Sequence, residues 1–514
     1  MNQSVLNMGT SIVGAVVSLA IGLVYTPFLV NSLGVEAYGF IPLAYSLIQY
    51  LSFILQTLSA AISQRLISQV NVPASYNRIF STSVVLCAPL AVMVLVVFWM
   101  LLAPFATLVI NIPKGLHTEV SWLIVGMGGG FGVSLLSTPF AGVLFSQHQL
   151  FIISIVQMLE SVIRVVATVA MFLILVPSLF FVSFGIAVAS IIRAICLVFA
   201  VRWKRPSLEF SINNYDPALP RSLARTSGGV LLDTVGTVLM FNSELFLINH
   251  IYGAERGGMY ALTMQWVVVL RVLGLSVAAN ATARVMQVFY SERREVLIAV
   301  TARYIRFLGA FVALPTGFIA GVAPDLLSVW LSPEFAINWK ILVALSIPVT
   351  FYVNSMPLGA IMLAADKTYH SGFSNLITAI LFVVVSFSAA KNLHWGGVEV
   401  ALTLGAALLA KNFIFMIPFA SRLAGPGALR SFLFASILPI LWISTCYLAA
   451  KILASILMPA SFLDLTIIGF LTALVFAPVA IVSLPRKDVR FLVHEFVSVI
   501  MLMGRVVRTI HFSK

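Results

Sequence analysis

Apolar runs of about 20 or more residues recur along the whole chain, and they constrain its fold more than any other feature. Each run is long enough for an α-helix to cross roughly 30 Å of hydrocarbon. A bilayer core admits only structures that satisfy their own backbone hydrogen bonds. The chain is also 61% hydrophobic and only 9% charged. The sequence therefore predicts an all-α polytopic membrane protein.

Hydropathy and turn residues divide the chain into about 14 predicted transmembrane helices. The run from Ser11 to Val30 is too long for a signal-peptide core and lacks a small-residue cleavage site, so we expect an uncleaved first span. The predicted spans cover residues 9–30, 39–62, 80–108, 120–145, 150–176, 179–201, 227–249, 258–283, 306–331, 340–363, 371–390, 397–420, 431–455 and 463–484.

The distribution of Lys and Arg predicts the orientation of these spans. With the N-terminus in the cytoplasm, 21 of the 30 Lys and Arg fall in cytoplasmic segments, five on the opposite face and four inside spans. This asymmetry follows the positive-inside rule, so we expect both termini in the cytoplasm. It also accounts for the net charge of +13 without a nucleic-acid partner.

A weak repeat divides the first twelve spans into two halves of six. Because six is even, the two halves would enter the membrane from the same side, an arrangement that transporters use for alternating access. The matched positions, at an offset of 219 residues, are Gly34 with Gly253, Glu36 with Glu255, Gly39 with Gly258 and Arg65 with Arg284.

The repeat and the charge pattern together predict five segments. The last of them mixes apolar and basic positions, which favours an amphipathic segment along the membrane surface. The segments are an N-terminal lobe (1–205), a cytoplasmic inter-lobe linker (206–226), a C-terminal lobe (227–425), two appended helices (426–484) and a basic amphipathic cytoplasmic tail (485–514).

Three cations, Arg164, Arg271 and Lys411, lie near the midpoints of predicted spans. A cation at that depth needs a partner, a polar cavity or a ligand. Arg271 and Lys411 have no acid within four residues, which favours a role in binding an anionic substrate. Arg164 follows Glu160 by four residues, so it either pairs with that acid or contacts substrate. Arg193 lies nearer a helix end and is expected to snorkel.

Two acids, Asp233 and Glu244, lie on one face of the seventh predicted helix, since eleven residues are close to three turns. Two interpretations stay open. The acids are counter-ions for Arg271 or Lys411, or they form a proton or sodium site that couples transport to an ion gradient. No other cofactor and no metal is expected.

The second predicted helix carries a polar stripe with helical spacing. Such a stripe is either interhelical glue or the wall of a water-filled path. Because Tyr and Gln suit sugar hydroxyls, we favour the path and expect Tyr45, Gln49 and Gln56 to contact substrate. The stripe consists of Tyr45, Gln49, Ser52, Gln56, Ser59 and Ser63.

Several motifs of enzymes are missing from the sequence. It contains no G-x-x-x-x-G-K-[ST] phosphate loop, no HExxH and no CxxC. The three cysteines lie inside predicted spans and do not indicate a disulfide framework. No predicted loop is long enough for a soluble catalytic domain, so we expect a protein that is not an enzyme.

Two hairpins resemble those of a known family. The stretch NSLGVEAYGF, followed by a polar helix that ends in ISQRLISQVN, resembles the start of the bacterial polysaccharide flippases. These are lipid-linked oligosaccharide exporters of the multidrug/oligosaccharidyl-lipid/polysaccharide superfamily. The second-half signature of the family is similar to Glu244, Gly253, Gly258 and Tyr260 here. The family usually has Asp at the first of these positions, and many members have a basic residue where this chain has Asn31.

The resemblance implies a two-lobed fold with a central cavity in the bacterial cell (inner) membrane. It implies translocation of an undecaprenyl-pyrophosphate-linked oligosaccharide from the cytoplasmic to the outer leaflet by alternating access, in cell-surface polysaccharide biosynthesis. The implied partners are this lipid-linked glycan, membrane lipids and other polysaccharide assembly proteins.

Two alternatives remain. A multidrug or organic-cation exporter of the same superfamily should place carboxylates at mid-membrane, whereas the central charges here are mostly positive. A membrane-embedded glycan polymerase or ligase needs an outer loop with catalytic residues, and the predicted outer loops are all short.

Overall fold

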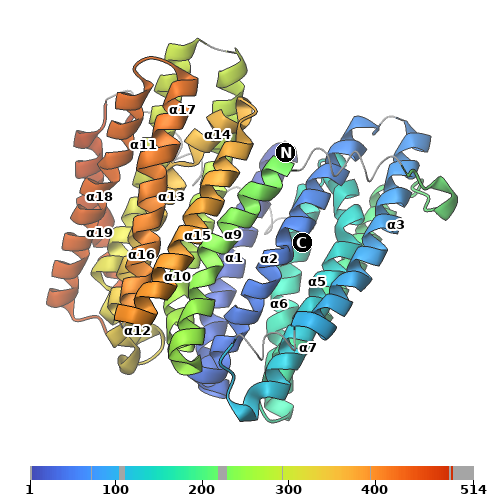
Figure 1. Ribbon diagram of the computed structural model, residues 1–514, viewed down its shortest axis with the longest axis horizontal. Helices are drawn as coiled ribbons and strands as arrows, with labels where there is room; N and C mark the ends of the chain where they lie inside the picture. The colour runs from blue at the N-terminus through green and yellow to red at the C-terminus, as the bar shows by residue number, and fades with distance from the viewer. Residues whose placement is uncertain are drawn as a thin grey trace. The chain divides into compact units, whose positions relative to one another are not determined.

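The computed structural model describes residues 3–70, 72–102, 110–217, 228–291, 293–393, 395–485 and 488–489, and these form helices joined by short turns (Figure 1). No β-strand occurs among these residues. The helices are α1 (Gln3–Leu33), α2 (Val35–Ser68), α3 (Pro73–Val97), α5 (His117–Ser146), α6 (Leu150–Ile174), α7 (Leu179–Lys204), α9 (Gly228–Tyr252), α10 (Ala254–Ser291), α11 (Arg294–Gly321), α12 (Ala323–Trp330), α13 (Trp339–Asn354), α14 (Met356–Ala364), α15 (Thr368–Leu393), α16 (Gly397–Ala410), α17 (Ile417–Ala424), α18 (Ala428–Leu457) and α19 (Phe462–Ser483). Five short helices join them: η1 (Phe98–Leu102), η2 (Lys114–Leu116), η3 (Ile212–Asn214), η4 (Pro333–Asn338) and η5 (Lys411–Met416).

Twelve of the described helices are long and apolar enough to cross a membrane. A thirteenth is α2, whose parts Val35–Ser52 and Ile54–Ile67 meet at a bend of 44°. The remaining predicted span, 9–30, coincides with α1, in which the apolar helix found is the shorter Ala20–Leu33. The all-α polytopic fold is confirmed, with 12 or 13 candidate spans in the described part against the 14 predicted.

The chain forms two compact units. Unit 1 contains the described residues of Met1–Thr234 and Tyr252–Gly258, and unit 2 contains those of Val235–Ile251 and Met259–Ile500. Helices α18 and α19 therefore fall within unit 2. The predicted boundaries at residues 205, 226, 425 and 484 stay predictions.

In unit 1, α5 is the central helix. It packs against α2, α3 and α7, while α6 packs between α1 and α7. These spans are mostly aliphatic, and their buried side chains include the cluster around Ile62, Leu144 and Leu197. Close-packed aliphatic side chains supply the contacts that hold helices together in lipid, where the hydrophobic effect between them is absent.

In unit 2, α11 is the central helix, and it packs along α13 and α18 (Figure 1). Helix α18 in turn packs against α19. The α11–α18 contact is close at Gly317, because a Cβ atom placed there would lie 2.5 Å from the Cβ atom of Cys446 and 2.7 Å from the carbonyl oxygen of Ile443. Small residues at such crossings let helix backbones approach each other in membranes.

The same backbone turn occurs at both copies of the repeat. Gly34 separates α1 from α2 with φ of 81°, and Gly253 separates α9 from α10 with φ of 89°. Only glycine adopts this left-handed conformation without a steric penalty from Cβ. The turn explains why both glycines stand at equivalent places in the sequence.

The chain after α19 is tied to α11 by a buried ion pair. Asp488 accepts a hydrogen bond of 2.9 Å from Nε of Arg303 and one of 2.5 Å from Nη2 of Arg306. The rest of the predicted tail, 490–514, lies outside the described residues, as do residues 218–226 of the predicted linker. The amphipathic tail therefore stays a prediction.

Candidate functional site

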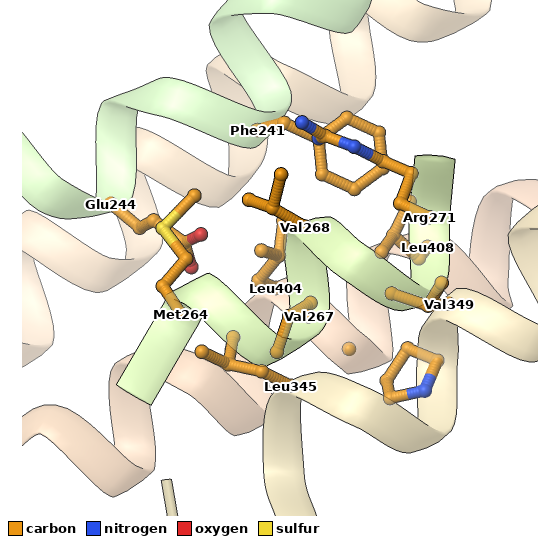
Figure 2. Close-up of a pocket in the computed structure, with 12 residues that line it drawn as sticks. Phe241, Glu244, Met264, Val267, Val268, Arg271, Leu345, Val349, Leu404 and Leu408 are labelled. Carbon is orange, nitrogen blue, oxygen red and sulfur yellow. The ribbon is translucent and has the colours of Figure 1, made fainter. Parts of the chain in front are cut away.

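Arg271 lies in the membrane-spanning helix α10, where an aromatic ring holds its side chain. Its guanidinium carbon is 4.5 Å from the centroid of the Phe241 ring on α9, a cation–π contact. Figure 2 shows the side chain extending to that ring. None of the ion pairs in the described part of the chain involves Arg271. The guanidinium is therefore held by a neutral group inside a span.

Lys411 opens η5, a π-helical turn between α16 and α17. Its amine donates a hydrogen bond to Oδ1 of Asn375 on α15, and Nδ2 of Asn375 donates one of 3.0 Å to Oγ1 of Thr237 on α9. The amine also lies 5.7 Å from the centroid of the Tyr352 ring on α13. Short π-helical turns inside α-helices occur frequently at functional sites.

The two cations meet around one pair of aromatic rings. The rings of Phe241 and Tyr352 are in edge contact, with centroids 4.9 Å apart and planes at 72°. Arg271 lies on the first ring and Lys411 near the second. We call these four residues the cation–aromatic cluster. The structure thus brings together two cations that are 140 positions apart in the sequence.

Glu244 on α9 is buried beside this cluster. It is 2% exposed and accepts a hydrogen bond of 2.7 Å from the hydroxyl of Tyr260 on α10. A cavity of about 10 Å³ lies in unit 2, and Glu244 and Arg271 both line it. The rest of its lining is apolar and includes Met264 and Val268 (Figure 2). A buried acid and a half-buried arginine therefore share a cavity with room for about one water.

Asp233 does not line this cavity. It is half-buried on α9, and it belongs to unit 1, whereas Glu244 belongs to unit 2. It is not among the described residues that line the cavity. Of the two acids, Glu244 alone lines the cavity with Arg271, and the role of Asp233 as a counter-ion stays a prediction.

Arg164 occupies a separate site in unit 1. Its Nη1 donates a hydrogen bond of 2.8 Å to the hydroxyl of Tyr45 on α2. Its Nε and the hydroxyl of Tyr25 on α1 are buried and have no hydrogen-bond partner in the described part of the chain. A buried guanidinium with an unused donor is costly unless something else binds there.

Glu160, one of the two partners that the sequence left open for Arg164, forms its ion pair with Arg193. Glu160 lies 3.5 Å from Nε of Arg193 on α7, and Nη1 of Arg193 donates a hydrogen bond of 3.1 Å to Ser134 on α5. Arg193 therefore contacts its neighbours instead of snorkelling. The reason is that side chains of adjacent packed helices compete with partners one turn away, and helical spacing alone does not rank them.

The polar stripe of α2 hydrogen-bonds partly within its own helix. The hydroxyl of Ser52 donates a hydrogen bond of 2.7 Å to the carbonyl oxygen of Gln49. The side-chain amide of Gln56 donates one of 3.4 Å to the hydroxyl of Ser52. Gln49 and Gln56 are exposed, and Tyr45 is half-buried against Arg164. This arrangement fits a wettable surface better than interhelical glue.

Sequence reasoning missed Phe241, Tyr352 and Asn375. Aromatic residues are common in membrane spans, so the two rings carry no signal of their own. Asn375 is different, because a lone amide inside a span is itself a sign of a polar contact. Tyr260 belongs to the family signature quoted above, and the structure shows its contact with Glu244.

Arginine, lysine and glutamate side chains inside helical spans are typical of polytopic transporters, which keep ionisable groups in the membrane for substrates and ions. The chain belongs to the polysaccharide biosynthesis protein family, whose model matches residues 4–283. It is 25% identical over 426 residues to the uncharacterized membrane protein EpsK of Bacillus subtilis (strain 168). The aligned region covers 82% of this chain and 83% of EpsK.

Solved structures show the same fold. The lipid II flippase MurJ, in an inward closed conformation, matches with a TM-score of 0.69 at 13% identity and covers 92% of this chain and 99% of that one. An inward-facing multidrug resistance MATE family transporter of the MOP superfamily matches with a TM-score of 0.63 at 13% identity, covering 83% of this chain and 98% of that one. The resemblance to polysaccharide flippases of this superfamily is confirmed. The protein is a multi-pass membrane protein with a MOP-type transporter fold.

Proposed function

We propose that the protein is a flippase that moves an undecaprenyl-pyrophosphate-linked oligosaccharide from the cytoplasmic to the outer leaflet by alternating access. The family and the transporter fold support this class of activity. We place the protein in the bacterial cell (inner) membrane with both termini in the cytoplasm. Its expected partners are the lipid-linked glycan, membrane lipids and other proteins of polysaccharide assembly.

The cation–aromatic cluster carries the proposal. Arg271 lies on a neutral ring, and Lys411 donates to a neutral amide. A pyrophosphate must lose water to cross the membrane, and a guanidinium and an ammonium can replace that water with charge-assisted hydrogen bonds. Arg164 and Tyr45 offer a second cationic contact in unit 1. Gln49 and Gln56 supply exposed amides that suit sugar hydroxyls.

An exporter of organic cations remains the alternative, since the MATE transporter shares the fold. Such a substrate needs a carboxylate that it can reach. Glu244 is fully buried and already accepts a hydrogen bond from Tyr260, whereas the half-buried charged side chains of the cluster are positive. The sign of these charges favours an anionic substrate. A polymerase or ligase finds no support in the cluster, which has no nucleophile beside a base.

Transport by the purified protein tests the proposal. Proteoliposomes would carry a fluorescent pyrophosphate-linked oligosaccharide, and reagent added outside would report the fraction that has crossed. We expect the Arg271→Ala, Lys411→Ala double variant to flip at least tenfold more slowly than the wild type. Lys391→Ala, which removes an exposed charge from α15, is the matched control and should flip normally. Equal rates for the double variant and the wild type would refute the cationic site.

We also propose that Glu244 couples transport to protons and not to sodium. A sodium ion needs several oxygen ligands, and the cavity offers one carboxylate together with the repelling guanidinium of Arg271. A proton needs only one oxygen of Glu244. The groups that face this carboxylate from the packed helices are Tyr260 and Arg271 on α10, and the other lining residues are apolar.

Imposed gradients distinguish the two ions. We expect an inward proton gradient to accelerate flipping by the wild type, and a sodium gradient to leave its rate unchanged. Glu244→Gln should abolish the response to protons while Glu255→Gln, at the start of α10, retains it. If a sodium gradient accelerates flipping, or if a proton gradient still accelerates flipping by Glu244→Gln, the coupling proposal is wrong. Neither result would bear on the proposal that Arg271 and Lys411 bind the substrate.

A further inference from the structure

The segment after α7, residues 205–217, is bound along α3 within unit 1, and we call it the strap. Ser81 on α3 accepts a hydrogen bond of 3.2 Å from the backbone N–H of Ser211. Thr82 accepts one of 2.9 Å from the N–H of Asp216. Asp216 also pairs with Arg78 at 3.6 Å. The described part of the predicted linker is therefore fixed to the first unit.

The strap contacts α3 at Ser81 and Thr82, where the predicted span 80–108 begins. Ser81 and Thr82 are eight and nine residues after Pro73, which starts α3, so they stand about 12–14 Å along the helix from its end. Both hydroxyl-bearing residues are 0% exposed. Near the hydrocarbon, backbone N–H groups need protein acceptors in place of water. The two hydroxyls supply those acceptors for the strap.

The outward side of the strap carries large apolar side chains. Ile212 is 69% exposed, and Phe210 and Tyr215 are also exposed. Leu208 points the other way and is buried in the core of unit 1. These three apolar side chains lie within six positions of a segment that is hydrogen-bonded to a membrane-spanning helix. Such a segment is typical of one that faces the boundary of the acyl chains. The exposed polar residues Glu209, directly before Phe210, and Asn213, directly after Ile212, suit the headgroup level.

A basic and aromatic end precedes the strap. Trp203 is 75% exposed, and the amine of Lys204 lies 4.3 Å from the centroid of its ring. Arg202 beside them is exposed. Arg205 is held differently, because it lies 3.7 Å over the Tyr76 ring and donates to the carbonyl oxygen of Val70. Exposed tryptophan next to Lys and Arg is typical of a membrane–water interface.

We propose that the strap lies in the membrane surface and binds acidic phospholipids there. Phe210, Ile212 and Tyr215 enter the boundary of the acyl chains, and Arg202 and Lys204 contact the lipid phosphates. A strap in open water would leave these apolar groups hydrated and would not need the buried hydroxyls of α3 as acceptors. The inference concerns unit 1 alone and does not depend on what the protein transports.

The depth of Ile212 tests the position of the strap. A nitroxide would be attached to Ile212→Cys in the full chain in nanodiscs, in a Cys196→Ala background where Cys87 and Cys446 are buried. We expect collisions with oxygen to exceed those with an aqueous nickel complex, as for the lipid-facing control Phe470→Cys on α19. The water-facing control is Glu334→Cys on η4. Collision rates at Ile212 that match those at Glu334, as free water or a soluble partner at the strap would give, refute the proposal.

Lipid preference tests the binding of acidic headgroups. A fluorophore on the same Ile212→Cys chain would be quenched by brominated phosphatidylglycerol or brominated phosphatidylcholine. We expect a severalfold preference for phosphatidylglycerol, because each surface Lys or Arg favours an acidic lipid by about fivefold. The preference should vanish in Arg202→Gln, Lys204→Gln and persist in the control Lys391→Gln. Equal quenching by the two lipids in the unsubstituted chain would overturn the acidic-lipid site.

Discussion

Tyr260 on α10 donates a hydrogen bond of 2.7 Å to Glu244 on α9, across the turn that Gly253 makes between the two helices. Both residues are almost completely buried. The bond therefore joins the first part of α10 to α9 from inside the packed unit, and it supplies the donor that a buried carboxyl group needs.

Removing the donor should destabilise unit 2. We expect Tyr260→Phe to lower the free energy of unfolding by about 1–3 kcal/mol, because the buried Glu244 is left without its partner. Thermal unfolding in detergent measures the effect. The control is Tyr290→Phe, which removes a bond to the carbonyl oxygen of Ala364 from a mostly exposed side chain. A shift no larger than that of the control would mean that the bond contributes little.

Phe241→Leu should slow flipping without unfolding the protein. The substitution removes the ring on which Arg271 lies and the edge contact with Tyr352. A cation–π contact is worth about 0.5–2 kcal/mol, so we expect a loss of roughly 2- to 30-fold in rate. The liposome assay gives the rate, and Phe470→Leu on the exposed face of α19 serves as the control. An unchanged rate would show that the ring does not position Arg271.

Glu160→Gln should destabilise unit 1 because it leaves Arg193 without its anion. The pair is only partly shielded, with side chains 27% and 18% exposed, so we expect a loss of about 1–3 kcal/mol. Adding Arg193→Met should restore much of the stability, since both charges are then gone. Arg164→Met in the Glu160→Gln background is the matched comparison. If it restores stability equally well, Arg193 is not the partner that matters.

Gly317→Ala should destabilise the contact between α11 and α18 by about 1–3 kcal/mol, since the added methyl group meets Cys446 and a backbone carbonyl. The matched control is Gly359→Ala on α14, where the nearest atom is the flexible end of Met416 at 4.0 Å. There we expect a neutral or slightly stabilising change of up to about 1 kcal/mol. Unfolding in detergent compares the two, and equal effects would contradict the close crossing.

The helical fold was predictable because apolar runs that cross a bilayer leave one choice of structure. The turns at Gly34 and Gly253 were visible as matched glycines, and the left-handed backbone explains them. The breaks inside spans were not predictable. The π-helical turn at Lys411 and the bend in α2 have no clear signal in the types of the residues that form them.

The charged residues of the candidate site were predictable from the sequence, but the side chains that contact them were not. Arg271 and Lys411 stood out because a cation inside a span is rare. Their shared aromatic pair depends on how α9, α10, α13 and η5 pack, which no spacing within one helix reveals. The same limit explains why spacing along α6 offered only Arg164 as a partner for Glu160, whereas the ion pair forms with Arg193.

The two halves that share the matched turns differ in which of them carries charged side chains. The offset of 219 that relates Gly34 to Gly253 also relates Tyr25 to Glu244 and Ser52 to Arg271. The first copy of the repeat therefore has the neutral side chains of Tyr25 and Ser52 at these positions. The second copy has the charged side chains of Glu244 and Arg271. At these two pairs of matched positions, the charged side chains stand in the second copy of the repeat alone.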